Sequence, residues 1–130
     1  MTSRRTSATR LAVGVGLVAS LAACGGTSQS TTQGTVPATP DLTVLAQDIK
    51  FDKTEYTAKP GSVSLAYLSK GNQSHNLVLE DVSGNRVGKE LIVGPGASTG
   101  EVFTLTAGTY RMYCTIPGHK ASMNATLTVA

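Results

Sequence analysis

The 130-residue sequence contains no tryptophan, two phenylalanines and two cysteines. With few aromatic side chains and at most one disulfide, a small domain has little beyond its aliphatic core to stabilise it. No segment of eleven residues carries apolar side chains at a convincing helical spacing, which argues against a helical fold. Internal repeats are also absent. Together these absences favour a small β-protein, for which a bound ion would add stability.

Residues 1–23 have the layout of a secretory signal peptide. Three arginines precede an apolar run that is shorter than the roughly 20 residues needed to span a bilayer, and small residues follow it. The segment LAAC, Leu21–Cys24, spans the end of this leader and resembles the bacterial lipobox, in which the cysteine receives a lipid. We predict export and lipid anchoring at Cys24 on the extracytoplasmic side of a membrane. Cleavage without lipidation is the alternative, and Sec export fits better than the twin-arginine route.

The basic charge of the sequence belongs to this leader. Three of the eleven Lys and Arg residues leave with it, so eight basic residues face eight acidic ones in the mature chain. A neutral chain offers no electrostatic attraction to nucleic acid or to an anionic membrane surface. We therefore expect no nucleic-acid partner.

The mature chain divides into a linker and one domain. Residues 24–40 are rich in Ser, Thr, Gly, Gln and Pro, and Val36 is the one large aliphatic residue among them. This composition is typical of a flexible tether. Residues 41–130 remain as a single compact domain, which we expect to be monomeric.

The domain shows the period-two alternation of half-buried strands. The pattern occurs in LTVLA, SVSLAYL, NLVLE, GEVFTLT, GTYRMYC and NATLTVA, and turn sequences rich in Gly, Pro and Asn separate these segments. The segment NRVGKELIV is the best helix candidate, but Gly88 and its β-branched end weaken it. Seven to eight short strands predict an all-β, antiparallel Greek-key sandwich.

Four metal-binding side chains stand at the ends of these predicted strands. Cys114, His119 and Met123 follow the spacing C-x₄-H-x₃-M around a Pro-Gly turn, and His75 stands where a loop enters a strand. Two imidazoles, one thiolate and a weak axial thioether are the ligands of a blue-copper site. Zinc sites use Cys, His or carboxylate, so the methionine favours copper.

Each of these residues taken alone has a simpler interpretation. A lone histidine at a strand end is more often structural, a methionine more often fills a core, and a buried cysteine is often inert. Their joint placement favours the metal site, because both histidines and the one cysteine outside the lipobox belong to it. Met112 lies within a strand, and we assign it to the core.

The segments HNLVLE and GTYRMYCTIPGHKASMNATLTV resemble the cupredoxins, the small blue copper proteins that include plastocyanin, azurin and auracyanin. The resemblance covers the whole domain. It implies one copper ion bound by His75, Cys114, His119 and Met123, and one-electron transfer as the activity. The Cys–His spacing is of the azurin length.

The resemblance also implies roles for neighbouring residues. Asn76 fits the position that ties the ligand loops together, and its backbone N–H is a candidate donor to the Cys114 sulfur. Ile116 is a second candidate donor, because the proline follows it. Such bonds would raise the reduction potential. Ser74 stands where azurin has a glycine whose carbonyl lies near the metal, so a fifth contact stays open.

Three classes of function compete for these residues. An electron carrier would dock transient partners at an apolar face around His119, with Ile116, Pro117 and the loop at 94–96. An enzyme is disfavoured, because copper oxidases and nitrite reductases need further histidines and none is left. Extracytoplasmic copper binding or trafficking is the alternative, because the same ligands bind Cu(I).

Overall fold

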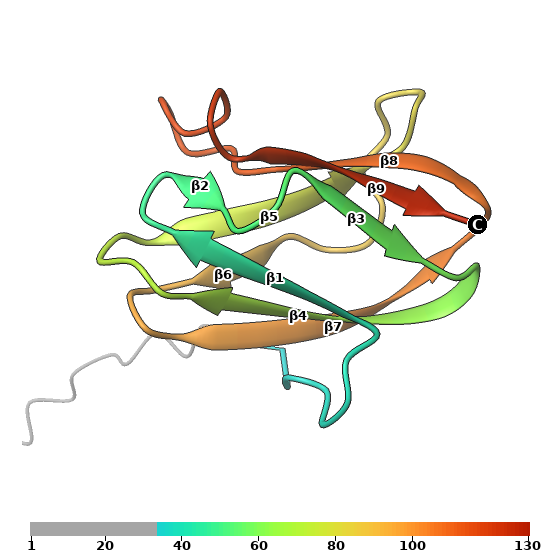
Figure 1. Cartoon of the computed structure of the whole chain (residues 1–130), viewed down its shortest axis with the longest axis horizontal. Helices are drawn as coiled ribbons and strands as arrows, with labels where there is room; N and C mark the ends of the chain where they lie inside the picture. Colours follow the sequence, from blue (N-terminus) through green and yellow to red (C-terminus); the bar gives the residue numbers. More distant parts are fainter. Residues whose placement is uncertain (1–33) are drawn as a thin grey trace, which may run out of the picture.

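The computed structural model describes residues 34–130, and within this range the chain forms two packed β-sheets without a helix (Figure 1). The first sheet has the order β2-β1-β4-β7 and the second the order β3-β9-β8-β5-β6. The strands are β1 (Leu42–Gln47), β2 (Lys50–Phe51), β3 (Glu55–Ala58), β4 (Gly61–Ser69), β5 (His75–Glu80), β6 (Leu91–Val93), β7 (Ser98–Leu105), β8 (Gly108–Tyr113) and β9 (Asn124–Val129). The predicted all-β sandwich is confirmed, with nine strands in the described range in place of seven to eight.

Alternating burial explains most of these strands. In β9, Ala125, Leu127 and Val129 are buried and the residues between them are exposed. β5 differs, because Leu77, Val78 and Leu79 are all buried in this strand, which lies between β8 and β6 in the second sheet. The weak helix candidate ends in a strand, since its last three residues form β6.

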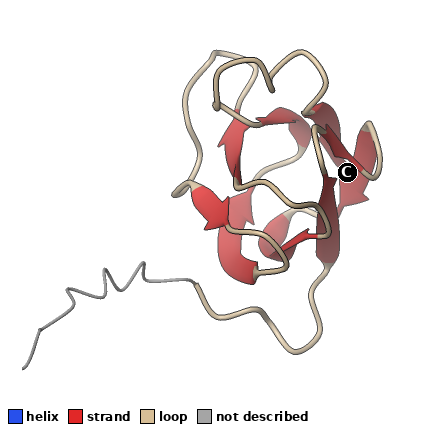
Figure 2. Cartoon of the chain, turned by 90° about the vertical axis from the view of Figure 1, so that its left-hand side faces the viewer, coloured by secondary structure: helices blue, strands red, loops and turns tan. Residues whose placement is uncertain are grey.

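The sequence predicts an antiparallel sandwich, but two of the strand pairs are parallel. β1 pairs in parallel with β4, and β3 pairs in parallel with β9, whereas β4–β7, β5–β6, β5–β8 and β8–β9 are antiparallel. The parallel strands belong to different hairpins, so short-range alternation gives no information about them. This arrangement brings the loops at 70–74, 94–97 and 114–123 to the end of the sandwich on the left of Figure 1, here called the donor end, and Figure 2 turns this end toward the viewer.

The opposite end, here called the far end, carries the turn at Lys59–Pro60 and the C-terminal Ala130. The core between the sheets is mainly aliphatic, and Phe51 and Tyr67 meet there edge to face at 6.3 Å. No helix in residues 34–130 is long and apolar enough to cross a membrane. The predicted signal peptide and Cys24 lie outside the described residues and stay predictions.

Candidate metal centre

His75 is the first residue of β5 and is held by the neighbouring strand β6, where it pairs with Val93. Its side chain is 0% exposed. Neither Nδ1 nor Nε2 has a hydrogen-bond partner. A buried polar atom without a partner typically destabilises a fold by about 1–3 kcal/mol, so such atoms are rare unless a ligand uses them.

The other candidate ligands lie on one loop, Cys114–Met123, between β8 and β9. The loop begins with a turn in which the His119 N–H donates to the Ile116 carbonyl at 3.0 Å. Pro117 and Gly118 occupy its centre, and Gly118 has φ = 84°, as expected for a type II turn. The Met123 N–H donates to the His119 carbonyl at 2.8 Å, and the Met123 carbonyl accepts from the Cys114 N–H at 3.0 Å. These bonds fold the loop back on itself.

The two segments bring three donor side chains together. The ligand atoms of His75, Cys114 and His119 lie within 4.8 Å of one another. Cys114 Sγ is 3.8 Å from His119 Nδ1, and the two imidazole rings are 5.2 Å apart between centroids. Three N and S donors around one ion, with bonds of roughly 2.0–2.3 Å as in zinc sites, lie about 3.8 Å apart in a trigonal plane. The donors therefore fit a single metal ion.

The electrostatics of the site favour the ligand form of His75. Burial lowers the pKa of His75, and the neighbouring His119 lowers it further, whereas Asp48 acts weakly in the opposite direction. A lowered pKa keeps the imidazole neutral near pH 7. Metal ions bind the neutral imidazole, so the ring is prepared for a metal.

Met123 closes the ligand loop beside the thiol. Its side chain is 0% exposed and belongs to the same buried cluster as Cys114. Its backbone is bonded to both other ligands of the loop, as described above. Its role as the axial ligand stays a prediction, and so does a contact from the Ser74 carbonyl.

The Asn76 side chain joins the strand of one ligand to the loop of the others. Its Oδ1 accepts from the Thr115 N–H at 2.7 Å, and its Nδ2 donates to Thr115 Oγ1 at 2.5 Å. Nδ2 also donates to a carboxylate oxygen of Glu90. A carboxylate only accepts and a backbone N–H only donates, so both ends of the amide are specified. Asn76 thus connects β5 to the loop Cys114–Met123.

The proposed hydrogen bonds to sulfur stay predictions. The hydrogen bond found at Cys114 Sγ leads to His119 Nδ1. Donation from the backbone N–H groups of Asn76 and Ile116 is therefore not established. The Ile116 carbonyl supports the Pro-Gly turn, and its side chain packs against the core.

Sequence reasoning missed three residues that position the site. Thr115 and Glu90 hold the Asn76 amide, and the Tyr67 hydroxyl donates to the Asn76 carbonyl at 3.2 Å. Burial raises the pKa of Tyr67, and the nearby Cys114 raises it further, so the hydroxyl stays a donor. Tyr67 alternates with other buried residues of β4, and this pattern cannot be distinguished from ordinary core packing.

Comparison with known proteins agrees with this site. Residues 38–130 match the copper binding proteins of the plastocyanin/azurin family. Auracyanin-A of Chloroflexus aurantiacus is 32% identical over 152 aligned positions, which cover 92% of this chain and 94% of that protein.

Solved structures show the same fold. Dithionite-reduced auracyanin of Roseiflexus castenholzii is 24% identical, with a TM-score of 0.63, over 72% of this chain and 99% of its own. Auracyanin A of Chloroflexus aurantiacus, a blue copper protein, is 24% identical with a TM-score of 0.61, over 71% and 100%. An azurin of Methylomonas sp. strain J is 20% identical with a TM-score of 0.59, over 68% and 95%. The chain belongs to the plastocyanin/azurin family of copper-binding proteins, and His75, Cys114 and His119 form its site for one copper ion.

Proposed function

We propose that the protein carries single electrons between redox partners outside the cytoplasm. Bound copper would supply the chemistry by alternating between Cu(I) and Cu(II). The observation that carries the proposal is the fully buried His75 ring, with two unpartnered nitrogens beside the Cys114 thiol and the His119 ring. The sequence has two histidines, and both stand in this site, so no histidine remains for the second metal centre of a copper enzyme.

The chain's own contribution is to keep the donors in place. His75 is fixed by β-sheet pairing, and the loop Cys114–Met123 is fixed by its internal hydrogen bonds and by Asn76. A site held in this way changes little between the two oxidation states. Small rearrangement lowers the barrier to electron exchange, as a carrier requires.

The test is an absorption and electron-spin-resonance spectrum of the copper-loaded protein, followed by repeated reduction and oxidation. We expect an intense blue colour, full reversibility and retention of copper through many cycles. Met123→Leu should change the spectrum, and Met112→Leu is the matched control, because Met112 is also 0% exposed but lies in β8. A colourless protein would refute the proposal. Transfer of copper to an apo-acceptor within a few cycles would favour the trafficking alternative.

The surface around His119 is the proposed docking face. His119 is 9% exposed whereas His75 and Cys114 are 0% exposed, so its ring is the ligand nearest to solvent. Ile116, Pro117 and the loop at 94–96 are the proposed apolar surroundings. Because the mature chain carries equal numbers of basic and acidic residues, association with a partner should depend little on salt. A steep fall of the association rate with ionic strength would contradict an apolar docking face.

We also propose that lipid at Cys24 anchors the protein to the extracytoplasmic side of a membrane. The LAAC sequence after a short apolar leader supports this placement. The Cys24→Ser variant should move from the membrane fraction to the soluble fraction, and the mass of the mature wild-type chain should include a lipid. A wild-type chain of unmodified mass would exclude the anchor.

A further inference from the structure

The sandwich has one long edge strand. In the described range the edges of the two sheets are β2, β7, β3 and β6. β7 has eight residues, whereas β2, β3 and β6 have two, four and three. A long edge offers unpaired N–H and C=O groups and is a ready template for pairing with another chain, which folded proteins prevent by covering or charging it.

Residues 34–37 occupy part of this edge. The Gly34 carbonyl accepts from the Gly100 N–H at 3.3 Å and from the Thr99 hydroxyl at 3.2 Å. Thr99 is 2% exposed although it lies on the edge strand. Figure 1 shows the segment, in cyan, running below β7 before the chain turns up into β1.

The contact depends on two glycines that allow close approach of the backbones. A Cβ atom at Gly34 would lie 2.1 Å from the Gly100 carbonyl oxygen. A Cβ atom at Gly100 would lie 2.5 Å from Pro37 Cδ and 3.0 Å from Val36 Cα. No side chain fits at either position without displacing the segment.

The segment also covers the outer face of the sheet. Ser98, Val102 and Thr104, at alternate positions of β7, are exposed, but Gly100 between them is buried. Its partner on β4, Ala66, is 1% exposed. Val36 and Pro37 therefore sit over a pair of small residues that would otherwise face solvent.

An ion pair lies at the second half of the β7 edge. Lys89 Nζ lies 2.6 Å from a carboxylate oxygen of Glu101, and the Lys89 side chain remains 65% exposed. Val102, beside this pair, is 54% exposed. A solvated lysine next to an edge strand opposes pairing. The segment 34–37 itself meets the edge at Gly100, whose N–H donates to the Gly34 carbonyl.

We propose that residues 34–37 form an edge strap that keeps the protein monomeric, and that its displacement lets β7 of two copies pair edge to edge. The occupant that the strap excludes is a second copy of this chain, because the exposed edge around Val102 continues the strand on which the strap lies. The proposal is independent of copper and of the lipid anchor.

The test uses the exported chain with Cys24→Ser, so that neither lipid nor an intermolecular disulfide causes association. Gly34→Val displaces the strap from the segment side, and Gly100→Val displaces it from the strand side. Hydrogen exchange at the backbone amide of residue 100 should be at least tenfold faster in both variants than in the parent chain, after correction for the intrinsic exchange rate of the residue present there. Sedimentation over a concentration series should show a dimer with a dissociation constant at least tenfold lower than that of the parent chain.

Two further variants identify the interface. Thr104→Val adds apolar surface to the same strand away from the strap and should stay as monomeric as the parent chain. Val102→Lys, added to Gly34→Val, should restore the monomer while Gly100 exchange stays fast. Slow exchange at the amide of residue 100 in both Gly34→Val and Gly100→Val would refute the strap contact. Dimers that persist with Val102→Lys would refute edge pairing through β7, and so would single variants Gly34→Val and Gly100→Val that stay monomeric although the amide of residue 100 exchanges fast.

Discussion

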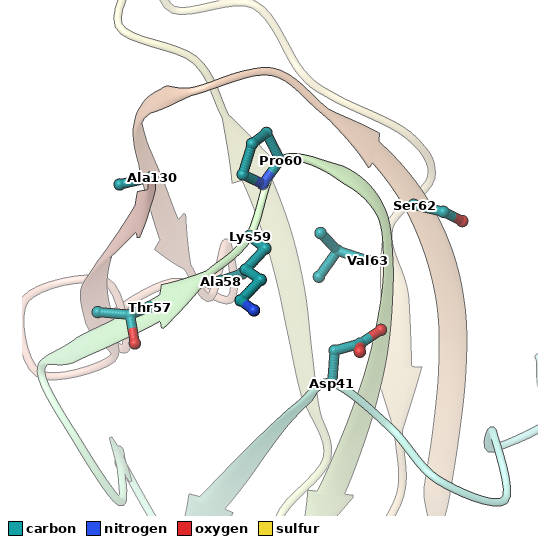
Figure 3. Close-up of a pocket in the computed structure, with 8 residues that line it drawn as sticks. All are labelled: Asp41, Thr57, Ala58, Lys59, Pro60, Ser62, Val63 and Ala130. Carbon is teal, nitrogen blue, oxygen red and sulfur yellow. The ribbon is translucent and has the colours of Figure 1, made fainter.

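The two ends of the sandwich differ in whether their polar side chains are buried and hydrogen-bonded. At the donor end, the His75 ring is completely buried and both of its nitrogens lack a hydrogen-bond partner. At the far end, Asp41 lies at an open cavity of about 530 Å³ near Lys59 and Ala130 (Figure 3). There the Asp41 carboxylate accepts from both the N–H and the hydroxyl of Ser64.

This difference distinguishes a binding site from a surface depression. Water would satisfy Asp41 if Ser64 were absent, so its hydrogen bonds contribute little. Water does not reach His75, so its missing partners destabilise the fold until a ligand supplies them. The far-end cavity has a volume of about 530 Å³, yet among residues 34–130 no set of metal-binding side chains converges in it. The functional end is therefore identified by buried polar atoms without hydrogen-bond partners, and not by the volume of a cavity.

The largest effect should come from removing the unsatisfied ring. At a free copper concentration about a thousandfold above the dissociation constant, copper should raise the free energy of unfolding by about 4 kcal/mol. His75→Leu should lose most of this gain. The same substitution should leave the metal-free protein as stable as before, or more stable by about 1–3 kcal/mol, because it removes buried polar atoms that have no partner.

Urea unfolding with and without copper measures both effects. Ser64→Ala is the far-end control, because it removes hydrogen bonds of Asp41 but should leave the copper gain intact. A metal-free His75→Leu protein that is clearly less stable than the wild type would mean that the imidazole has a stabilising partner. The claim that the donor end holds polar atoms without partners in the metal-free protein would then be wrong.

The fold shows how far local patterns reach. The six segments with visible alternation all became strands, including the regions of β1, β4 and β9. β2, β3 and β6 are two to four residues long, too short for a period of two to be recognised. The parallel pairing of β1 with β4 depends on contacts between residues about 23 positions apart, such as Leu42 with Leu65, which no local pattern contains.

The metal ligands could be predicted because few types of side chain bind copper. His75, Cys114 and His119 could therefore be selected by type and spacing alone. The residues that hold them are ordinary in type. Glu90 lies 14 positions from Asn76 and carries no sign in the sequence that it accepts a hydrogen bond there. Residue chemistry thus predicts ligands, whereas positioning requires the fold.

A smaller effect should follow from cutting the connection between the ligand segments. Asn76→Ala removes the hydrogen bonds to Thr115 and leaves a part-buried N–H without its acceptor. We expect the metal-free protein to lose about 1–3 kcal/mol of unfolding free energy, measured by urea denaturation. The donor end would thereby be shown to depend on its hydrogen bonds as well as on its metal.

Asn85→Ala is the matched control for this substitution. Asn85 also donates from its side chain, at 3.1 Å to the Asp81 carboxylate, but in an exposed turn. Its loss should change the unfolding free energy by less than about 0.5 kcal/mol. Equal losses for the two asparagines would show that the Asn76 connection is no stronger than a surface turn.

The smallest effect belongs to Asp41. The hydroxyl of Ser64, and next its backbone N–H, lower the pKa of Asp41 below its ordinary value. A carboxyl whose pKa is lower in the folded state stabilises the fold above its unfolded pKa, near pH 4, and this contribution disappears as the pH falls through the lower folded pKa. Urea unfolding at pH 6 and pH 3 should therefore show a slightly smaller acid-induced loss of stability in Asp41→Asn than in the wild type. Asp81 is unchanged in this variant. Its pKa is lowered mainly by the backbone N–H of Asn85, so it still contributes to the acid-induced loss of stability. An acid-induced loss as large in Asp41→Asn as in the wild type would show that the exposed carboxylate gains nothing from Ser64 that water does not provide.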